Sequence, residues 1–159
     1  MVLEVTEILK GLVQQSGTLK LELSPSLPEV VGDLTQIRQV IMNLISNAAE
    51  AHGTKRGQVS ITTGLRTMND TSLQGCQVLA HDARAGEYVY FEVSDQGAGI
   101  TPEVQSQLFD PFFTTKSKGR GLGLAAVVGI IRSHKAALQF DTKPGLGTTF
   151  TMYLPVAST

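Results

Sequence analysis

The chain contains little of what marks several classes of protein. Its 159 residues include no tryptophan, and aromatic side chains make up only 6% of them, so a base-stacking surface for nucleic acid is not expected. The 13 basic and 14 acidic side chains give a net charge of −1, which leaves no overall field to attract nucleic acid or an anionic membrane. Cys76 is the single cysteine, which excludes an internal disulfide and fits a reducing, cytoplasmic compartment.

Long apolar runs are also missing. No run approaches the roughly 20 residues of a membrane span. The opening MVLEVTEILKG lacks the basic region and the apolar core of a signal peptide. We therefore expect no membrane contact by this chain. The hydrophobic fraction of 42% over 159 residues predicts one domain with a substantial core.

The first third of the chain alternates helix and strand signals. Residues 2–13 have the spacing of a short amphipathic helix, and TLKLEL at 18–23 alternates as a half-buried strand does. Asp33 is a suitable N-cap for a helix that runs to about His52. The apolar face of that helix comprises Leu34, Ile37, Val40, Ile41, Leu44, Ile45 and Ala48.

The rest of the chain predicts a sheet covered by helices. The expected elements, in order, are strands over 57–65 and 87–95, a short helix from Thr101 to near Leu108, a lid-like segment over 109–120, a helix over about 121–133, and strands over 137–143 and 148–155. Between the first two strands, the polar segment 66–86 is expected to form a long hairpin loop or a partly disordered excursion.

Two asparagines interrupt the long helix. Asn43 and Asn47 are four residues apart, so both project from one face of the helix, one turn apart. Asparagine is a mediocre helix former, so the pair needs a reason. One interpretation is a pair of solvent-facing amides. The other is a site for Mg²⁺, because an amide oxygen is a suitable ligand when substrate phosphates supply the rest.

The stretch SDQGAGI places a carboxylate at the end of a strand. The carboxylate of Asp95 could accept a hydrogen bond from the N6 amine of adenine, whereas guanine would present a carbonyl oxygen there. Gly97 and Gly99 would let the backbone approach a flat ring without interference from a Cβ atom. The alternative is an ordinary turn of the Asp-x-Gly kind.

A cationic, glycine-rich stretch precedes the next helix. Free N–H groups over 121–124 would form an anion site at the helix start, with Lys116, Lys118 and Arg120 nearby. A dinucleotide loop is disfavoured because no strand directly precedes these glycines. The alternative is an exposed charged loop. The preceding FDPFFTTK suggests a hydrophobic clasp for a lid, a docking patch, or a loop that plugs the edge of the core.

Taken in order, these motifs resemble the catalytic ATP-binding domain of sensor histidine kinases, in the GHKL ATPase superfamily. The resemblance covers about 19–155 and is closest to the nitrogen-regulation and hybrid-kinase types. QIRQVIMNLISNAAEA is similar to the N box of this family, and DQGAGI is similar to its first glycine box. FDPFFTTK is similar to the F box, and GRGLGL is similar to the second glycine box. GLGTTF is similar to the glycine motif before the last strand.

The resemblance implies a fold and a division of the chain. The fold would be a two-layer α/β sandwich of the Bergerat type, a mixed sheet covered on one face by helices, with ATP held between the helices and a flexible lid. Residues 1–17 would be the junction helix from a dimerisation and phosphoacceptor domain, and 18–159 the catalytic domain.

The same resemblance assigns roles to individual residues. Asn47 would ligate Mg²⁺, with Asn43 assisting through the water shell of the metal. Asp95 would hold adenine, with Gly97 and Gly99 beside the ring. The residues expected at the phosphates and the rest of the nucleotide are Lys116 on the terminal phosphate, Arg120, Gly121, Leu122, Gly123 and Thr148. Glu50 departs from the family, many of whose members carry Lys or Arg there, which leaves one phosphate contact open.

Kinases of this type transfer the γ-phosphate of ATP to a histidine on a separate two-helix domain, and then to a response regulator or receiver domain. The resemblance implies these partners and a cytoplasmic protein, or the cytoplasmic part of a membrane-anchored sensor. His52, His81 and His134 do not lie in a phosphoacceptor motif and are expected to be surface or cap residues. The chain alone should therefore bind nucleotide without phosphorylating itself.

Two other functions fit the same motifs. A clamp-type ATP hydrolase of the superfamily would carry a glutamate in place of Asn43, because an amide cannot activate water as a general base. A nucleotide-binding interaction module without catalysis is the second, and Glu50 together with the absent acceptor histidine leaves it open.

Overall fold

The computed structural model describes residues 17–52, 57–110 and 123–157. They build one mixed sheet of six strands in the order β1-β2-β4-β6-β5-β3. The strands are β1 (Gly17–Glu22), β2 (Gly57–Met68), β3 (Val78–Leu79), β4 (Gly86–Ser94), β5 (Ala137–Lys143) and β6 (Gly147–Pro155). β1 pairs with β2 in parallel, and the other four pairings are antiparallel.

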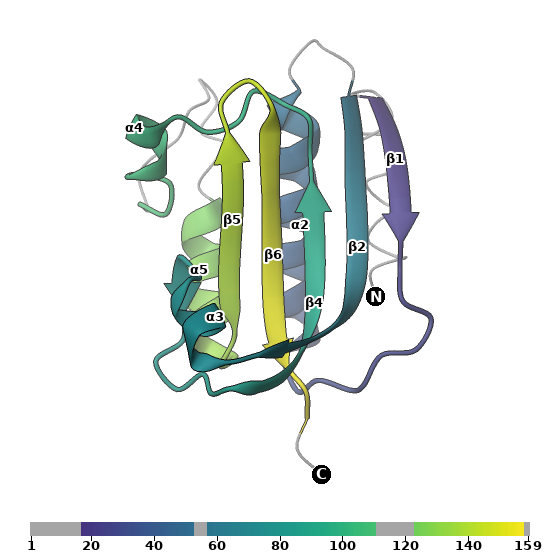
Figure 1. Ribbon diagram of the computed structural model, residues 1–159, viewed down its shortest axis with the longest axis vertical. Coiled ribbons are helices and arrows are strands. Elements are labelled where there is room, and N and C mark those ends of the chain that lie inside the picture. Colours follow the sequence, from purple (N-terminus) through teal and green to yellow (C-terminus); the bar gives the residue numbers. More distant parts are fainter. Residues whose placement is uncertain (1–16, 53–56, 111–122, 158–159) are drawn as a thin grey trace.

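Two long helices form the second layer. Figure 1 shows α2 (Leu34–Ala51) and α5 (Gly123–Ser133) behind the sheet, side by side across its width. The short α4 (Pro102–Gln105) lies at one end of the sheet, beyond the end of β5. This arrangement confirms the predicted two-layer α/β sandwich, with both long helices on one face of the sheet. No helix within the described ranges is long and apolar enough to cross a membrane.

α2 begins and ends where the sequence predicts. The Asp33 side chain accepts a hydrogen bond of 3.0 Å from the backbone N–H of Gln36, and His52 is the C-cap. The predicted apolar face is buried with one exception, because Leu34 is 55% exposed. Leu34 occupies the first turn, and the buried stripe starts only at Ile37, so the helix enters the core after its first turn.

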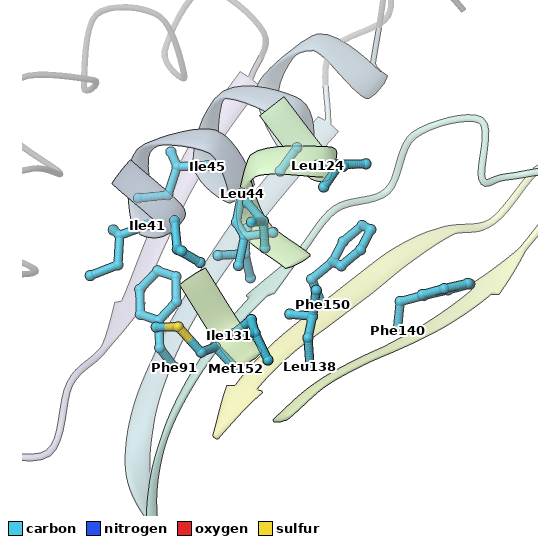
Figure 2. Close-up of a cluster of buried hydrophobic side chains, with 14 of the residues drawn as sticks. Ile41, Leu44, Ile45, Phe91, Leu124, Ile131, Leu138, Phe140, Phe150 and Met152 are labelled. Carbon is cyan, nitrogen blue, oxygen red and sulfur yellow. The ribbon is translucent and has the colours of Figure 1, made fainter. Parts of the chain in front are cut away.

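The core lies between the two layers. Figure 2 shows Ile41, Leu44 and Ile45 from α2 facing side chains of α5 and of the sheet. The labelled partners in that cluster are Leu124, Ile131, Phe91, Leu138, Phe140, Phe150 and Met152. Because successive strand residues point to opposite faces, the core residues that a strand contributes are two apart, as Val59 and Ile61 are on β2.

The segment 66–86 differs from its prediction. β2 continues to Met68, and the chain then forms α3 (Asp70–Gln74) and β3, which pairs with β5 at the sheet edge. The Asn69 side chain caps α3 by accepting from the N–H of Ser72 at 2.8 Å. Leu73 and Cys76 are buried in a second cluster with Met68 and Tyr88.

This second cluster also contains Ala137 and Tyr153, whose neighbours Leu138 and Met152 belong to the main core. Alternation along β5 and β6 therefore places α3 on the face of the sheet opposite to α2 and α5, as Figure 1 shows. The loop prediction was wrong because a few apolar residues, spaced among polar ones, are enough to order the segment once a sheet face is available.

His134 joins the two long helices. Its Nε2 accepts from the backbone N–H of Asp33 at 3.0 Å, and its Nδ1 lies 2.8 Å from the carbonyl oxygen of Ile130. The imidazole therefore links the end of α5 to the N-cap of α2. This confirms the expectation that His134 is a cap residue. His81 is exposed, also as expected.

Two leucines of α2 allow a matched test of the core. Leu44 is 1% exposed and Leu34 is 55% exposed. We expect Leu44→Ala to lower the free energy of unfolding by about 2–5 kcal/mol, because it leaves a cavity between the layers. Leu34→Ala should change it by no more than about 0.5 kcal/mol. Urea denaturation without nucleotide measures both, and equal losses would contradict the burial of Leu44.

Candidate functional site

A cavity of about 380 Å³ opens between α2, the end of β4, α4 and the start of α5. Its walls are mainly apolar and include Leu44, Ala48, Val93, Ile100, Leu124 and Phe150. A smaller set of polar residues also lines it, namely Asn47, Glu50, Asp95, Thr101 and Thr148. An apolar cavity with a few polar groups is the usual form of a small-molecule site.

Asp95 is the charged residue most deeply set in this cavity. It directly follows β4 and is only 8% exposed. Its Oδ1 accepts hydrogen bonds from the N–H groups of Gly97 at 2.8 Å and Thr148 at 3.2 Å. Both bonds end on the same oxygen, which leaves Oδ2 available to a group in the cavity.

Burial raises the pKa of the Asp95 carboxyl above its ordinary value. The hydrogen bonds from Gly97 and Thr148 and the proximity of His52 lower the pKa, but they offset the effect of burial only in part. Ionisation of this buried carboxyl therefore lowers the stability of the folded chain. Such an unfavourable charge is typical of functional sites.

Gly97 and Gly99 stand where the chain crosses other backbone. A Cβ atom on Gly97 would lie 2.5 Å from the carbonyl oxygen of Ala51. Gly99 has a φ of 74°, and a Cβ there would contact the backbone carbonyl of Lys143. A hydrogen bond of 3.3 Å from Ala98 N–H to Ala51 O joins the backbone segments that cross at Gly97. Close backbone packing thus requires glycine at both positions. Gly99 also lines the cavity, and the approach of both glycines to a ring stays a prediction.

The turn between β5 and β6 supports the cavity from the other side. Gly147 has a φ of 127°, and a Cβ there would meet the carbonyl oxygen of Asp95. Thr148 is buried, and its hydroxyl lies 2.7 Å from that of Thr142. The Thr142 hydroxyl in turn accepts from the N–H of Ile100 at 2.9 Å. The predicted glycine turn thus positions both Thr148 and the loop after Asp95.

The two asparagines of α2 occupy different places relative to the cavity. Both are half-buried, and Asn47 lines the cavity while Asn43 lies one turn earlier, outside its lining. The ranges that the structure describes contain no group of three or more His, Cys, Asp or Glu side chains that could hold a metal. A cation in this cavity would thus have few protein ligands, with oxygens of Asn47 and Glu50 on the α2 side of the lining, and would rely on the oxygens of its ligand for the rest.

Most of the predicted phosphate site lies outside the described residues. This applies to Lys116, Arg120, Gly121 and Leu122, and also to Phe112 and Phe113. Gly123 is the first residue of α5. Phe109, the first phenylalanine of FDPFFTTK, is half-buried, and its ring centroid lies 6.1 Å from that of Phe140.

Sequence reasoning missed part of the cavity wall. Val104 and Leu108 line it, and Ile100 precedes them at the loop end. Ile100, Val104 and Leu108 follow one another at intervals of four residues, which indicates one apolar face of a helix. It was overlooked because the segment is short, and α4 itself covers only Pro102–Gln105.

Comparison with known proteins identifies the family. A model described as "Histidine kinase-, DNA gyrase B-, and HSP90-like ATPase" matches residues 32–158. The chain belongs to this family. The match spans the whole cavity and confirms the family predicted from the order of the motifs, so the chain is an ATPase domain of the histidine-kinase type.

Relatives and solved structures agree with this assignment. The chain is 38% identical to the sensor kinase CckA of Brucella abortus (strain 2308) over 163 residues, which cover 97% of this chain and 17% of CckA. It is 35% identical to the sensory histidine kinase/phosphatase NtrB of Vibrio alginolyticus over 147 residues, 90% of this chain and 38% of NtrB. This histidine-kinase-type domain therefore spans well under half of each of these two relatives.

The fold is also that of a solved kinase domain. The catalytic domain of the histidine kinase ThkA superposes with a TM-score of 0.73 at 27% identity, covering 97% of this chain and 89% of that domain. The Bergerat-type α/β arrangement expected from the sequence is thereby confirmed.

The raised pKa of Asp95 predicts a stability change that depends on pH. A carboxyl whose pKa is higher in the folded state contributes stability below its unfolded pKa, and this contribution is lost as pH rises through the folded pKa. At neutral pH the buried charge is therefore unfavourable. We expect Asp95→Asn, which keeps an oxygen for Gly97 and Thr148, to raise the free energy of unfolding at neutral pH.

Urea denaturation of the ligand-free chain at neutral pH and at about pH 3 measures this effect, since an unfolded Asp is mostly protonated at the lower value. The gain should shrink at the lower pH. Asp141→Asn, at an exposed position on β5, is the control and should show little change. A gain of equal size at both pH values for Asp95→Asn would contradict the prediction.

Proposed function

We propose that this domain binds Mg-ATP and donates the γ-phosphoryl group to a histidine on a separate phosphoacceptor domain. The observation that carries the proposal is the buried Asp95 carboxylate, which lines an apolar cavity together with Asn47 and has its Oδ2 outside the two backbone hydrogen bonds. The sensor-kinase relatives support the same role. In the intact protein the acceptor would then pass the group to a response regulator or receiver domain, in the cytoplasm.

Asp95 would select adenine. Its Oδ2 is free to accept from the N6 amine of the base, while Oδ1 is held by backbone N–H groups from two segments. The apolar walls, among them Ile100 and Phe150, suit a flat aromatic ring. A base with an oxygen at position 6 would face the carboxylate lone pairs and leave a buried acceptor unpaired, which is a strong basis for rejection.

Asn47 would hold Mg²⁺ through its amide oxygen, with Asn43 acting through the water shell of the metal. Bound Mg²⁺ would neutralise charge on the phosphates. Asn47 lines the same cavity as Asp95 and lies one turn before Ala51, where α2 ends. An amide oxygen together with oxygens of the ligand suits a hard cation that keeps several waters.

The phosphates would extend toward the start of α5. Helix N-termini hold anions because their first N–H groups lack partners within the helix. α5 begins at Gly123, and Leu124 in its first turn lines the cavity. Lys116 and Arg120, with the backbone of 121–123, would complete this end of the site.

Phosphoryl transfer is favoured over hydrolysis by the residue at position 43. An amide cannot take a proton from water, so Asn43 supplies no general base.

Glu50 favours a second candidate function, because this acidic residue lines the cavity where anionic phosphates would lie. The second function is that of an interaction module, which would bind nucleotide without transferring its phosphoryl group.

Phosphate transfer distinguishes these functions. We expect no label on the chain alone after incubation with γ-labelled ATP, and little hydrolysis, because it lacks an acceptor histidine and a base for water. Adding the two-helix acceptor domain in trans should restore acid-labile histidine label, since proximity supplies much of the rate. Lys116→Ala should impair transfer more than ADP binding. Label on His52, His81 or His134, or brisk hydrolysis by the chain, would overturn the proposal.

The metal assignment has its own test. In wild type, Mg²⁺ should tighten ATP binding, and Asn47→Ala should remove most of that gain because the amide ligand is lost. Asn69→Ala is a matched control, since Asn69 caps α3 away from the cavity and its loss should leave the Mg²⁺ response intact. Calorimetric titrations with and without Mg²⁺ give the comparison. A wild-type response in Asn47→Ala would show that Asn47 is not a ligand.

A further inference from the structure

His52 is buried directly behind the loop that carries the cavity carboxylate. It is the C-cap of α2 and only 6% exposed. Its Nε2 accepts a hydrogen bond of 3.0 Å from the backbone N–H of Gln96, the residue that follows Asp95. The imidazole does not line the cavity, so it would act on a ligand through other groups, and its hydrogen bond is to Gln96.

The hydrogen bond defines the state of the imidazole. Because Nε2 accepts, the neutral ring carries its proton on Nδ1. That Nδ1 is buried and has no hydrogen-bond partner among the residues that the structure describes. A buried donor without a partner lowers stability and calls for an explanation. An apolar ring at this position would avoid the cost, so the acceptor at Nε2 is the feature that distinguishes histidine here.

Three elements meet at this imidazole. A Cβ on Gly57, at the start of β2, would lie 2.5 Å from the ring, so the ring packs against that strand. The side-chain oxygen of Gln96 accepts from Gln58 N at 2.9 Å, and Ala51 O accepts from Ala98 N at 3.3 Å. The loop after Asp95 is therefore held against the end of α2 and the start of β2.

The peptide group between Asp95 and Gln96 is held by a hydrogen bond at one end and closely approached by backbone at the other. Its N–H donates to His52 Nε2, and its carbonyl oxygen lies where a Cβ on Gly147 would collide with it. Because the peptide is planar, the bond to His52 restrains the orientation of the backbone that carries the Asp95 side chain. The same orientation lets Asp95 Oδ1 accept from Gly97 N.

We propose that His52 is a positioning residue for base selection. By accepting from Gln96, it holds the Asp95 carboxylate so that Oδ2 faces the position of the adenine amine. This inference rests on the proposed adenine site. It adds a residue that touches neither nucleotide nor metal, and it predicts that loss of the Nε2 acceptor reduces discrimination between bases.

Discrimination is measured with two nucleotides that differ at one position of the base. IDP carries an oxygen where ADP carries the N6 amine. Calorimetry gives the ratio of their dissociation constants for each variant of the chain. This ratio is independent of the folded fraction, because a loss of folded protein weakens both apparent affinities equally. A purely structural role for His52 would therefore leave the ratio unchanged.

We expect His52→Phe, which keeps the ring but removes the acceptor, to reduce the preference for ADP by about five- to tenfold, the effect of one net hydrogen bond. His52→Gln places an amide oxygen about as far from the backbone as Nε2 and should retain most of the preference. His52→Asn is too short to reach Gln96 N and should lose it. The Gln and Asn pair maintains the test if the Phe variant does not fold.

His134→Phe is the matched control. It removes a bond of the same kind and length, 3.0 Å from the N–H of Asp33 to Nε2, but at the far end of α2. It should lower the melting temperature and leave the ADP preference at the wild-type value. Equal loss of preference in both Phe variants would overturn the inference, and so would full preference in His52→Phe and His52→Asn. A wild-type chain without preference for ADP would instead refute the proposed adenine site.

Discussion

The constraint on which the site depends is the burial of one carboxylate at the end of a central strand. Asp95 follows β4, whose neighbours in the sheet are β2 and β6. An ionised group in this place needs hydrogen bonds, because burying it without them costs several kcal/mol by order of magnitude. The donors are backbone N–H groups of Gly97 and Thr148, which come from two different segments. The position of the carboxylate is therefore set by backbone, not by mobile side chains.

This requirement explains why backbone segments approach so closely around the site. The loop after Asp95 passes against the end of α2 at Gly97 and against the β5–β6 turn at Gly99 and Gly147. A side chain at any of these glycines would push the segments apart, and two of them also have a positive φ, 74° and 127°. These glycines thus allow close backbone packing, and the packing in turn shapes the wall of the cavity beside Asp95.

The sequence predicts the parts of this structure that depend on local pattern. The limits of α2 follow from Asp33 as a cap and from the apolar spacing after it, and the strands follow from alternation. The motif order predicts the family, because five short patterns in sequence constrain one another. The presence of Asp95, Asn47 and Thr148 at one cavity was within reach of that resemblance.

What the sequence could not show depends on tertiary contact. The segment 66–86 appears polar along the chain, and only the presence of a second sheet face orders α3 and β3. Leu34 fits the apolar spacing of its helix but lies before the turn that reaches the sheet. His52 looked like an ordinary helix end, because its partner Gln96 is distant in the sequence and lies in the loop after β4.

The cavity and the core are built from the same side chains. Leu44, Leu124 and Phe150 belong to the main core cluster and also line the cavity. A ligand that fills the cavity would therefore extend the core, and its binding free energy would add to the stability of the folded chain. The cost of the buried Asp95 charge acts in the opposite direction in the ligand-free state. Stability and ligand binding are thus coupled through α2, because residues of this helix both pack in the core and line the cavity.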